Sequence, residues 1–319
     1  MIADNALFVK WEEHKSLNGK VADRLHEIGE KGRSERMRDC AQVVQYKHCP
    51  QCDTWHVAYA NLCRDRLCPV CNWRLAVQRY GEMRRVLDGI CLTREALHWS
   101  FLTLTVPNCQ CERLSGMLGV MAKTWNRMTV QRWYQPKILG WARSVEVTYN
   151  AVSGDFHPHY HVILCWDGMQ FCEKDGARLE AEWLRLLQKE GVYASISAQS
   201  NKTIYARYCA DGEEPNPILS SVLETFKYAV KSSDVCAMPL DAFRCLVYGL
   251  KGKRLVSSGG IIKEVARELS AEFEQVKQTD VTVCSRCGSP ELEECIYRWA
   301  QGINKYVPLD RASGGGGGN

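Results

Sequence analysis

The segment DFHPHYHVIL, residues 155–164, carries histidines at positions 157, 159 and 161 and ends in an apolar run. Successive side chains of a β-strand point to opposite faces, so this spacing predicts a strand with all three imidazoles on one face. The preceding segment WARSVEVTYN, residues 141–150, also predicts a strand. Ser153 and Gly154 lie between the two segments and indicate a turn. Together these residues predict an antiparallel hairpin.

The first strand of this hairpin carries a carboxylate. If Ser153–Gly154 is a two-residue turn, Glu146 is paired with His161 and shares the histidine face. Paired side chains have Cβ atoms about 4.5–5.5 Å apart, close enough to share one metal ion. A carboxylate with two imidazoles and open coordination positions suits Mg²⁺ or Mn²⁺ as a Lewis acid on phosphate oxygens. A slip of one residue would move Glu146 to the other face, and a surface strand with unconnected histidines is the alternative.

Further helices and strands flank the hairpin. Helices are expected at residues 19–40, 111–129, 176–191 and 218–233, and strands at 98–107 and 192–200. This mixture favours an α+β fold with an antiparallel central sheet flanked by helices. The predicted parts are an N-terminal helical segment (1–45), a zinc-binding cysteine module (46–80), a main domain (90–275), a cysteine-containing C-terminal extension (276–312) and a flexible glycine tail (313–319).

Composition excludes some classes of protein. The chain has 319 residues, of which 45% are hydrophobic, enough for one large domain with a small satellite. It contains no apolar run of about 18 residues, so we expect no membrane span. The N-terminus does not resemble a secretory signal, so we expect a cytoplasmic location. The formal net charge of +4 permits a nucleic-acid partner without requiring one.

The 17 cysteines include several Cys-x-x-Cys pairs. In a reducing compartment such pairs indicate zinc rather than disulfides. Cys49–Cys52 and Cys68–Cys71 are separated by fifteen residues, which is zinc-ribbon spacing, and four thiolates complete a structural Zn²⁺ site. Because Cys63 is a surplus thiol, we predict that four of these five cysteines bind the ion.

A second pair, Cys284–Cys287, lies near the C-terminus. It predicts half of another zinc site, with partners among Cys295, Cys236 and Cys245. A free, reduced pair is the alternative.

The segment ILSSVLETFKYAVK, residues 218–231, is amphipathic when placed on a helix. The polar face carries Glu224, Lys227, Tyr228 and Lys231; the apolar arc carries Leu219, Val222, Leu223, Phe226, Ala229 and Val230. Nearby ammonium groups favour a phenolate and offset charge on a phosphate under attack. An ordinary solvated face is the alternative.

A basic segment precedes a pair of glycines. Lys251, Lys253 and Arg254 come shortly before Gly259 and Gly260. Glycine permits close approach of the backbone, so this segment is a candidate for phosphate contacts. A plain basic turn explains it nearly as well.

Five blocks of sequence resemble, in the same order, the rolling-circle replication initiator (Rep) proteins of small plasmids, members of the HUH endonuclease superfamily. HPHYHVIL contains the histidine–hydrophobe–histidine signature, and the other similar blocks are FLTLTV (101–106), ETFKYAVKSSD (224–234), CRDRLCPVCNWR (63–74) and LKGKRLVSSGGIIKE (250–264). The resemblance spans residues 50–270. It implies an HUH-type, ferredoxin/RRM-like endonuclease domain at 90–275.

The resemblance implies roles for residues of the tyrosine motif. Tyr228 would attack DNA, forming a 5′-phosphotyrosine and releasing a 3′-OH, and Glu224 would activate water for the terminating hydrolysis. From their charge rather than from the resemblance, we expect Lys231 to assist catalysis, and Lys227 to contact DNA together with the basic segment at 251–254. Weaker candidates for the nucleophile are Tyr160, Tyr205 and Tyr208.

The resemblance also selects metal ligands. The signature uses His159 and His161, so these two with Glu146 are the predicted Mg²⁺ or Mn²⁺ ligands, and His157 either replaces Glu146 or contacts DNA. For zinc, the resemblance favours Cys63, Cys68 and Cys71 with one earlier cysteine.

The implied function is nicking and religation of single-stranded plasmid origin DNA, including hairpin origins, in the bacterial cytoplasm. A host helicase and DNA polymerase are the partners that the resemblance implies. An HUH-type transposase or mobilisation relaxase is an alternative with the same metal site. A zinc-dependent DNA-binding repressor is an alternative of another class.

Overall fold

The computed structural model describes residues 2–94, 96–172, 174–204, 217–226, 230–276 and 282–309. The chain forms two compact units. The central unit comprises residues 74–273, and the terminal unit joins residues 1–73 with residues 274–319. The two ends of the chain therefore fold together, whereas the sequence indicated separate N-terminal and C-terminal parts; the five-part division stays a prediction.

The central unit is built on a five-stranded antiparallel sheet in the order β6-β3-β5-β4-β7. Its strands are β3 (Leu97–Thr105), β4 (Ile138–Asn150), β5 (Asp155–Asp167), β6 (Ser200–Ile204) and β7 (Val256–Gly260). The long hairpin β4–β5 occupies the middle of the sheet, and β5 is buried along most of its length. An antiparallel sheet flanked by helices was expected, and this part of the fold prediction is confirmed.

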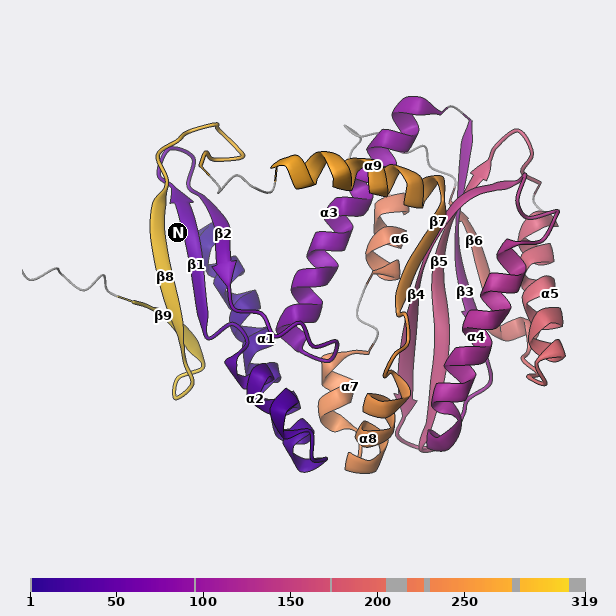
Figure 1. Cartoon of the computed structure of the whole chain (residues 1–319), viewed down its shortest axis with the longest axis horizontal. Helices are drawn as coiled ribbons and strands as arrows, with labels where there is room; N and C mark the ends of the chain where they lie inside the picture. The colour runs from indigo at the N-terminus through magenta and orange to yellow at the C-terminus, as the bar shows by residue number, and fades with distance from the viewer. Residues whose placement is uncertain are drawn as a thin grey trace, which may run out of the picture. The chain divides into compact units, whose positions relative to one another are not determined.

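Helices cover both faces of this sheet (Figure 1). They are α3 (Pro69–Thr93), α4 (Leu114–Thr129), α5 (Lys174–Lys189), α6 (Pro217–Thr225), α7 (Ser232–Ala237), α8 (Leu240–Gly249) and α9 (Ile261–Val276). On one face, Leu87 of α3 and Val222 of α6 join a core cluster with Ile163 of β5. On the other face, Trp125 of α4 and Trp183 of α5 lie against Tyr160. The alternation of β5 side chains thus separates two hydrophobic layers.

The turn of the β4–β5 hairpin differs from the prediction. Asn150 pairs with Asp155, so four residues rather than two form the loop, and Glu146 is opposite His159 instead of His161. The Asn150 side chain accepts hydrogen bonds from the backbone N–H groups of Val152 and Ser153, which stabilises this longer turn. The predicted register was therefore wrong by two residues. A shift of two preserves the face, so Glu146 still lies on the histidine side.

Three predicted elements end differently. The helix expected at 19–40 is two helices, α1 (Ile2–Glu27) and α2 (Lys31–Asp39), because Gly29 takes a left-handed φ of 89° between them. The strand expected at 192–200 is not formed: only residues 196–198 are regular, as a short 3₁₀ turn in which the Ser195 side chain accepts from the N–H of Ser197, and β6 begins at Ser200. Helix α6 ends at Thr225. Leu223, predicted on its apolar arc, is exposed.

The terminal unit contains a four-stranded antiparallel sheet in the order β2-β1-β8-β9. Its strands are β1 (Val43–Cys49), β2 (Thr54–Ala60), β8 (Glu293–Ala300) and β9 (Lys305–Pro308). The buried Trp11 of α1 makes edge contacts with Trp73 and with Tyr306 of β9. Aromatic packing therefore joins the first helix to the last strand. No helix among the described residues is both long and apolar enough to cross a membrane.

Candidate metal centres

The β4–β5 hairpin brings one carboxylate and two imidazoles together. Glu146 Oε2 lies 2.8 Å from Nε2 of His161 and 3.2 Å from Nε2 of His159. All three side chains are largely buried, so few water molecules compete for them. This group, the metal triad, lies on the same face of the sheet as the core cluster of α3 and α6.

Neighbouring groups orient both imidazoles of the metal triad. His159 Nδ1 lies 3.3 Å from the carbonyl oxygen of His157, and His161 Nδ1 lies 3.4 Å from the hydroxyl of Thr103. The ring of Phe101 stacks on His161 with an interplanar angle of 12°. A hydrogen bond at Nδ1 leaves Nε2 available as a ligand, which is the usual arrangement around metal-binding histidines.

The charge state of Glu146 suits a cation. Burial opposes its ionisation, but hydrogen bonds from His159 and His161 outweigh that effect and hold the pKa of Glu146 well below its ordinary value. Metal–ligand bonds of about 2.1 Å would separate neighbouring ligand atoms by about 3 Å in an octahedral site. The observed separations of 2.8 and 3.2 Å agree with this geometry, so the three residues fit a divalent ion.

His157 stands apart from the metal triad. It is half-buried, its ring centroid is 5.4 Å from that of His159, and it is not among the ligand atoms that converge. Burial and the neighbouring His159 lower the pKa of His157. A neutral imidazole thus lies at the rim of the site.

The tyrosine motif is described only in part. Val222 and Phe226 are buried in the core cluster, and Glu224 is half-buried on α6. Lys231 is exposed and precedes α7. The predicted nucleophile Tyr228, together with Lys227, Tyr205 and Tyr208, lies outside the described residues.

Tyr160 can be set aside as a nucleophile. It is 1% exposed and points to the opposite face of β5 from the metal triad. Burial raises its pKa to about 12, although the guanidinium of Arg143, 4.3 Å above its ring, favours the phenolate. A buried, protonated phenol cannot attack DNA.

The basic segment leads toward the metal triad. Lys251 and Arg254 are exposed, and Lys253 is half-buried. The carbonyl of Leu255 accepts a hydrogen bond from the backbone N–H of Val145, the residue before Glu146. The edge of the sheet therefore carries basic side chains beside the strand that holds Glu146.

The glycine pair after this segment has a packing role. A Cβ at Gly259 would approach the Trp141 ring within 2.5 Å, and one at Gly260 would approach the Leu139 carbonyl within 2.1 Å. The glycines therefore allow close contact with β4. The phosphate contact expected of this segment stays a prediction.

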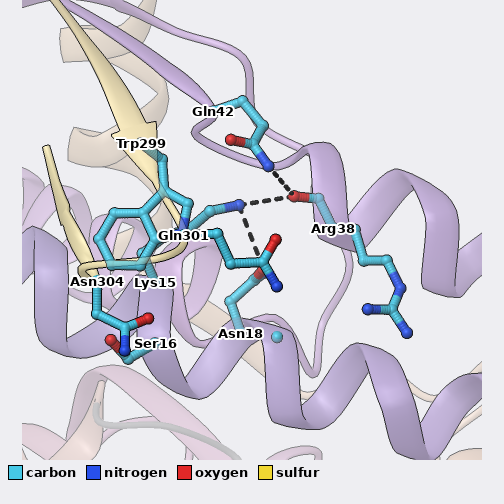
Figure 2. A pocket seen from close by; sticks show the side chains of 9 residues that line it. Lys15, Ser16, Asn18, Arg38, Gln42, Trp299, Gln301 and Asn304 are labelled. Atoms are coloured by element: carbon cyan, nitrogen blue, oxygen red, sulfur yellow. Dashed lines mark hydrogen bonds between the residues drawn. The ribbon is translucent and has the colours of Figure 1, made fainter. Parts of the chain in front are cut away.

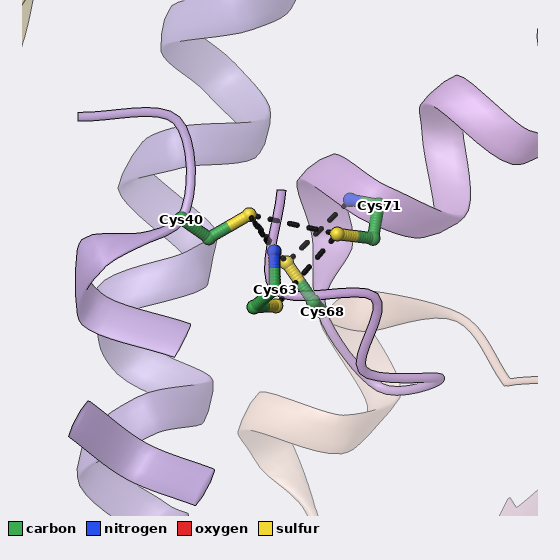
Figure 3. A group of neighbouring side chains, drawn as sticks. All are labelled: Cys40, Cys63, Cys68 and Cys71. Atoms are coloured by element: carbon green, nitrogen blue, oxygen red, sulfur yellow. Dashed lines mark hydrogen bonds between the residues drawn. The ribbon is translucent and has the colours of Figure 1, made fainter. Parts of the chain in front are cut away.

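In the terminal unit, Cys40 joins Cys63, Cys68 and Cys71 (Figure 3). Sulfur–sulfur distances from Cys40 are 3.6 Å to Cys68 and 3.5 Å to Cys71, and Cys63 is 3.7 Å from Cys71. A tetrahedral ion with Zn–S bonds of about 2.3 Å separates its sulfurs by about 3.8 Å, so the four thiols fit zinc. We call this group the first cysteine cluster.

The first cysteine cluster is surrounded by hydrogen-bond donors. The backbone N–H of Arg64 lies 3.2 Å from the sulfur of Cys71, and the amide of Asn18 lies 3.2 Å from that of Cys68. Hydrogen bonds from Cys40 and Cys68 lower the pKa of Cys71, whereas the hydrogen bonds with Cys63, Cys68 and Cys71 raise that of Cys40. The two N–H donors favour the thiolates of Cys68 and Cys71, the form that binds metal.

Lys15 of α1 contacts the backbone at Cys40 and at Arg38, and Figure 2 shows its bonds to Arg38 and Asn18. The buried ammonium of Lys15 donates to the carbonyls of Arg38 at 2.7 Å and Cys40 at 2.5 Å, and it lies 3.5 Å from Asn18 Oδ1. These carbonyls belong to the end of α2, whose orphan acceptors are thereby satisfied. Sequence spacing missed Cys40 because its partners follow more than twenty residues later.

The other cysteines are not grouped as the sequence predicted. Cys49 and Cys52 converge with Cys284 and Cys287, not with Cys68 and Cys71. Cys245, one of the partners considered for Cys284, is instead disulfide-bonded to Cys111.

Comparison with known proteins gives one matching family model and several similar proteins. The family model described as "Replication protein" matches residues 54–307. A "Protein rep" of Lactiplantibacillus plantarum is 30% identical over 286 residues, covering 84% of each chain. A "Protein rep" of Lentilactobacillus hilgardii is 29% identical, and the alignment covers 82% of this chain and 83% of the relative. A "Protein rep" of Bacillus amyloliquefaciens is 26% identical, and the alignment covers 86% of this chain and 84% of the relative. No solved structure matches.

Proposed function

This chain belongs to the replication protein (Rep) family of plasmid replication initiators, and we propose that it nicks and religates single-stranded origin DNA. The observation that carries the proposal is the metal triad on the central hairpin, which converges on one point. We assign it to Mg²⁺ or Mn²⁺ and the surrounding sheet to the HUH type. When bound, such an ion supplies Lewis-acid polarisation of the scissile phosphate.

The residues of the chain perform the transfer itself. The Tyr228 phenolate attacks the phosphorus, an O–P bond to tyrosine forms, and the bond from phosphorus to the 3′ oxygen breaks. The leaving oxygen takes a proton and becomes the 3′-OH that a host polymerase extends. Lys231 and Lys227 offset the charge on the pentavalent phosphate. A host helicase is the second expected partner, and the reaction takes place in the bacterial cytoplasm.

Glu224 has a separate proposed role in termination. It precedes Tyr228 by four residues. As a general base it would take a proton from water, which then cleaves the phosphotyrosine. Glu224→Ala should therefore nick normally and fail to release the final product. Normal release by this variant contradicts the role.

Origin binding is proposed to use the basic segment at 251–254 and the terminal unit. The first cysteine cluster is assigned to a structural zinc ion, because four thiolates leave no open coordination position for catalysis. His157, at the rim of the metal triad, is assigned to DNA contact rather than to the metal.

The test is incubation of the purified full chain with a single-stranded origin oligonucleotide and Mn²⁺. We expect a covalent protein–DNA adduct that is absent with Tyr228→Phe and present with Tyr193→Phe, an exposed tyrosine elsewhere in the central unit. An adduct that persists in Tyr228→Phe contradicts the assignment of the nucleophile. Tight origin binding without cleavage would favour the zinc-dependent repressor.

A further inference from the structure

A second group of four cysteines lies in the terminal unit, and it joins residues from the two ends of the chain. The Cys49 sulfur is 3.5 Å from that of Cys287, and the Cys52 sulfur is 3.5 Å from that of Cys284. All four sulfurs lie within 4.8 Å of one another. These separations are too long for disulfides of about 2.05 Å and close to the sulfur–sulfur edge of about 3.8 Å in a tetrahedral zinc site.

Both Cys-x-x-Cys pairs end in a similar backbone conformation. Each is followed by a residue with a left-handed backbone, Asp53 at φ 51° and Gly288 at φ 74°. In the second turn the N–H of Gly288 donates to the carbonyl of Cys284 at 2.8 Å, and the N–H of Cys284 donates to the carbonyl of Ser289 at 2.7 Å. The two turns present their sulfurs to each other.

Strand pairing brings the two turns together. β1 pairs antiparallel with β8, so His48 at the end of β1 lies opposite Glu293 at the start of β8. The turn that follows β1 and the turn that precedes β8 must consequently lie at the same end of the sheet. From β2, the His56 Nε2 lies 3.4 Å from the Cys284 sulfur, which provides a further N–H donor for a thiolate.

We propose that Cys49, Cys52, Cys284 and Cys287 hold a second structural zinc ion, which ties the C-terminal segment to the N-terminal hairpin. The first cysteine cluster lies at the other end of the same hairpin, beyond the seven-residue strand β1. At about 3.4 Å per residue this strand separates the two sites by more than 20 Å. The sites share no ligand, so they fill independently. The inference does not depend on DNA cleavage.

The test is native mass spectrometry of the zinc-grown full chain, with circular dichroism to monitor folding. Apart from any ion in the metal triad, which all of these proteins retain, wild type should carry two cysteine-bound zinc ions, and both Cys284→Ser/Cys287→Ser and Cys40→Ser/Cys63→Ser should carry one. The matched control Cys172→Ser/Cys295→Ser, which removes two thiols outside both groups, should keep two.

Replacement of zinc by Co²⁺ adds a second readout, because tetrathiolate Co²⁺ has intense charge-transfer absorption. We expect this absorption to halve in Cys284→Ser/Cys287→Ser. A single cysteine-bound ion in wild type, or a zinc count in that variant equal to that of wild type, would overturn the site. Loss of both ions from the variant would overturn independent filling. A chain that carries two zinc ions and fails to nick DNA leaves this inference standing and removes only the proposed function.

Discussion

The metal triad and the two cysteine clusters differ in how their ligands are distributed along the sequence. The triad comes from one hairpin, within residues 146–161, whereas the cysteines of the terminal unit interleave over residues 40–287. In the hairpin, the side on which a residue lies depends only on whether the register shift is even or odd. Among the cysteines, the partners depend on which strands pair. The geometry of one hairpin thus determines the metal triad, whereas pairing between strands that are distant in the sequence determines the two cysteine clusters.

The prediction with the greatest change in nicking concerns the metal triad. Glu146→Gln keeps the shape of the side chain but removes the charge that faces both imidazoles, so nicking in Mn²⁺ should fall by more than about 100-fold, beyond the loss typical of outer-shell changes. The rate of adduct formation as a function of Mn²⁺ concentration measures this. Glu180→Ala, on α5 across the sheet, is the control and should match wild type. Unchanged nicking in Glu146→Gln would remove the triad from the mechanism.

The next prediction concerns the first cysteine cluster. Cys68→Ser removes a buried ligand of the first cysteine cluster and should lower the Tm of the terminal unit by about 10 °C or more, because zinc binding contributes folding free energy. Differential scanning calorimetry measures the shift, and Cys172→Ser, at an exposed position, is the control. A Tm equal to that of wild type would show that the cluster carries no stabilising ion.

A smaller change, in the affinity for Mn²⁺, is expected from the hydroxyl that orients His161 of the metal triad. Thr103→Val removes the hydroxyl beside His161 Nδ1 while preserving side-chain shape, so affinity for Mn²⁺ should fall by about 10-fold. Titration of the DNA-free protein with Mn²⁺ measures this without reference to cleavage. Thr103→Ser retains the hydroxyl and should restore the affinity. Equal weakening by both substitutions would point to packing rather than to the hydrogen bond.

Much of the fold of the central unit, like its metal triad, could be predicted from patterns within single segments of the sequence. Alternation in β4 and β5 and amphipathic periodicity in α4 and α5 are signals within single segments. The loop of four residues was missed because Ser153–Gly154 indicated a shorter turn, while the side chain of Asn150 stabilises the longer one. The resulting error of two residues left the face of Glu146 unchanged.

The terminal unit was less predictable. The spacing between Cys52 and Cys68 matched a zinc ribbon, but β2 lies within that interval and carries the chain to the far end of the hairpin. No feature near Cys49 indicates that its partners follow more than 230 residues later. The pairing of β1 with β8 determines this choice, and a single sequence carries little information about such pairing.

The last prediction concerns the two faces of strand β5, and no change in nicking is expected. Tyr160 lies between His159 and His161 but is buried on the opposite side of β5, and burial raises its pKa to about 12. Since the unfolded phenol ionises near pH 10, the neutral buried form contributes stability that is complete below pH 10 and is lost as the pH rises through 12, by about 2 kcal/mol. Tyr160→Phe lacks this ionisation, so its unfolding free energy should decline less between pH 9 and 12, as denaturant titrations would measure. Its nicking should equal that of wild type, because only the histidine face meets the metal; a loss of nicking in a variant that stays folded would place Tyr160 in the reaction.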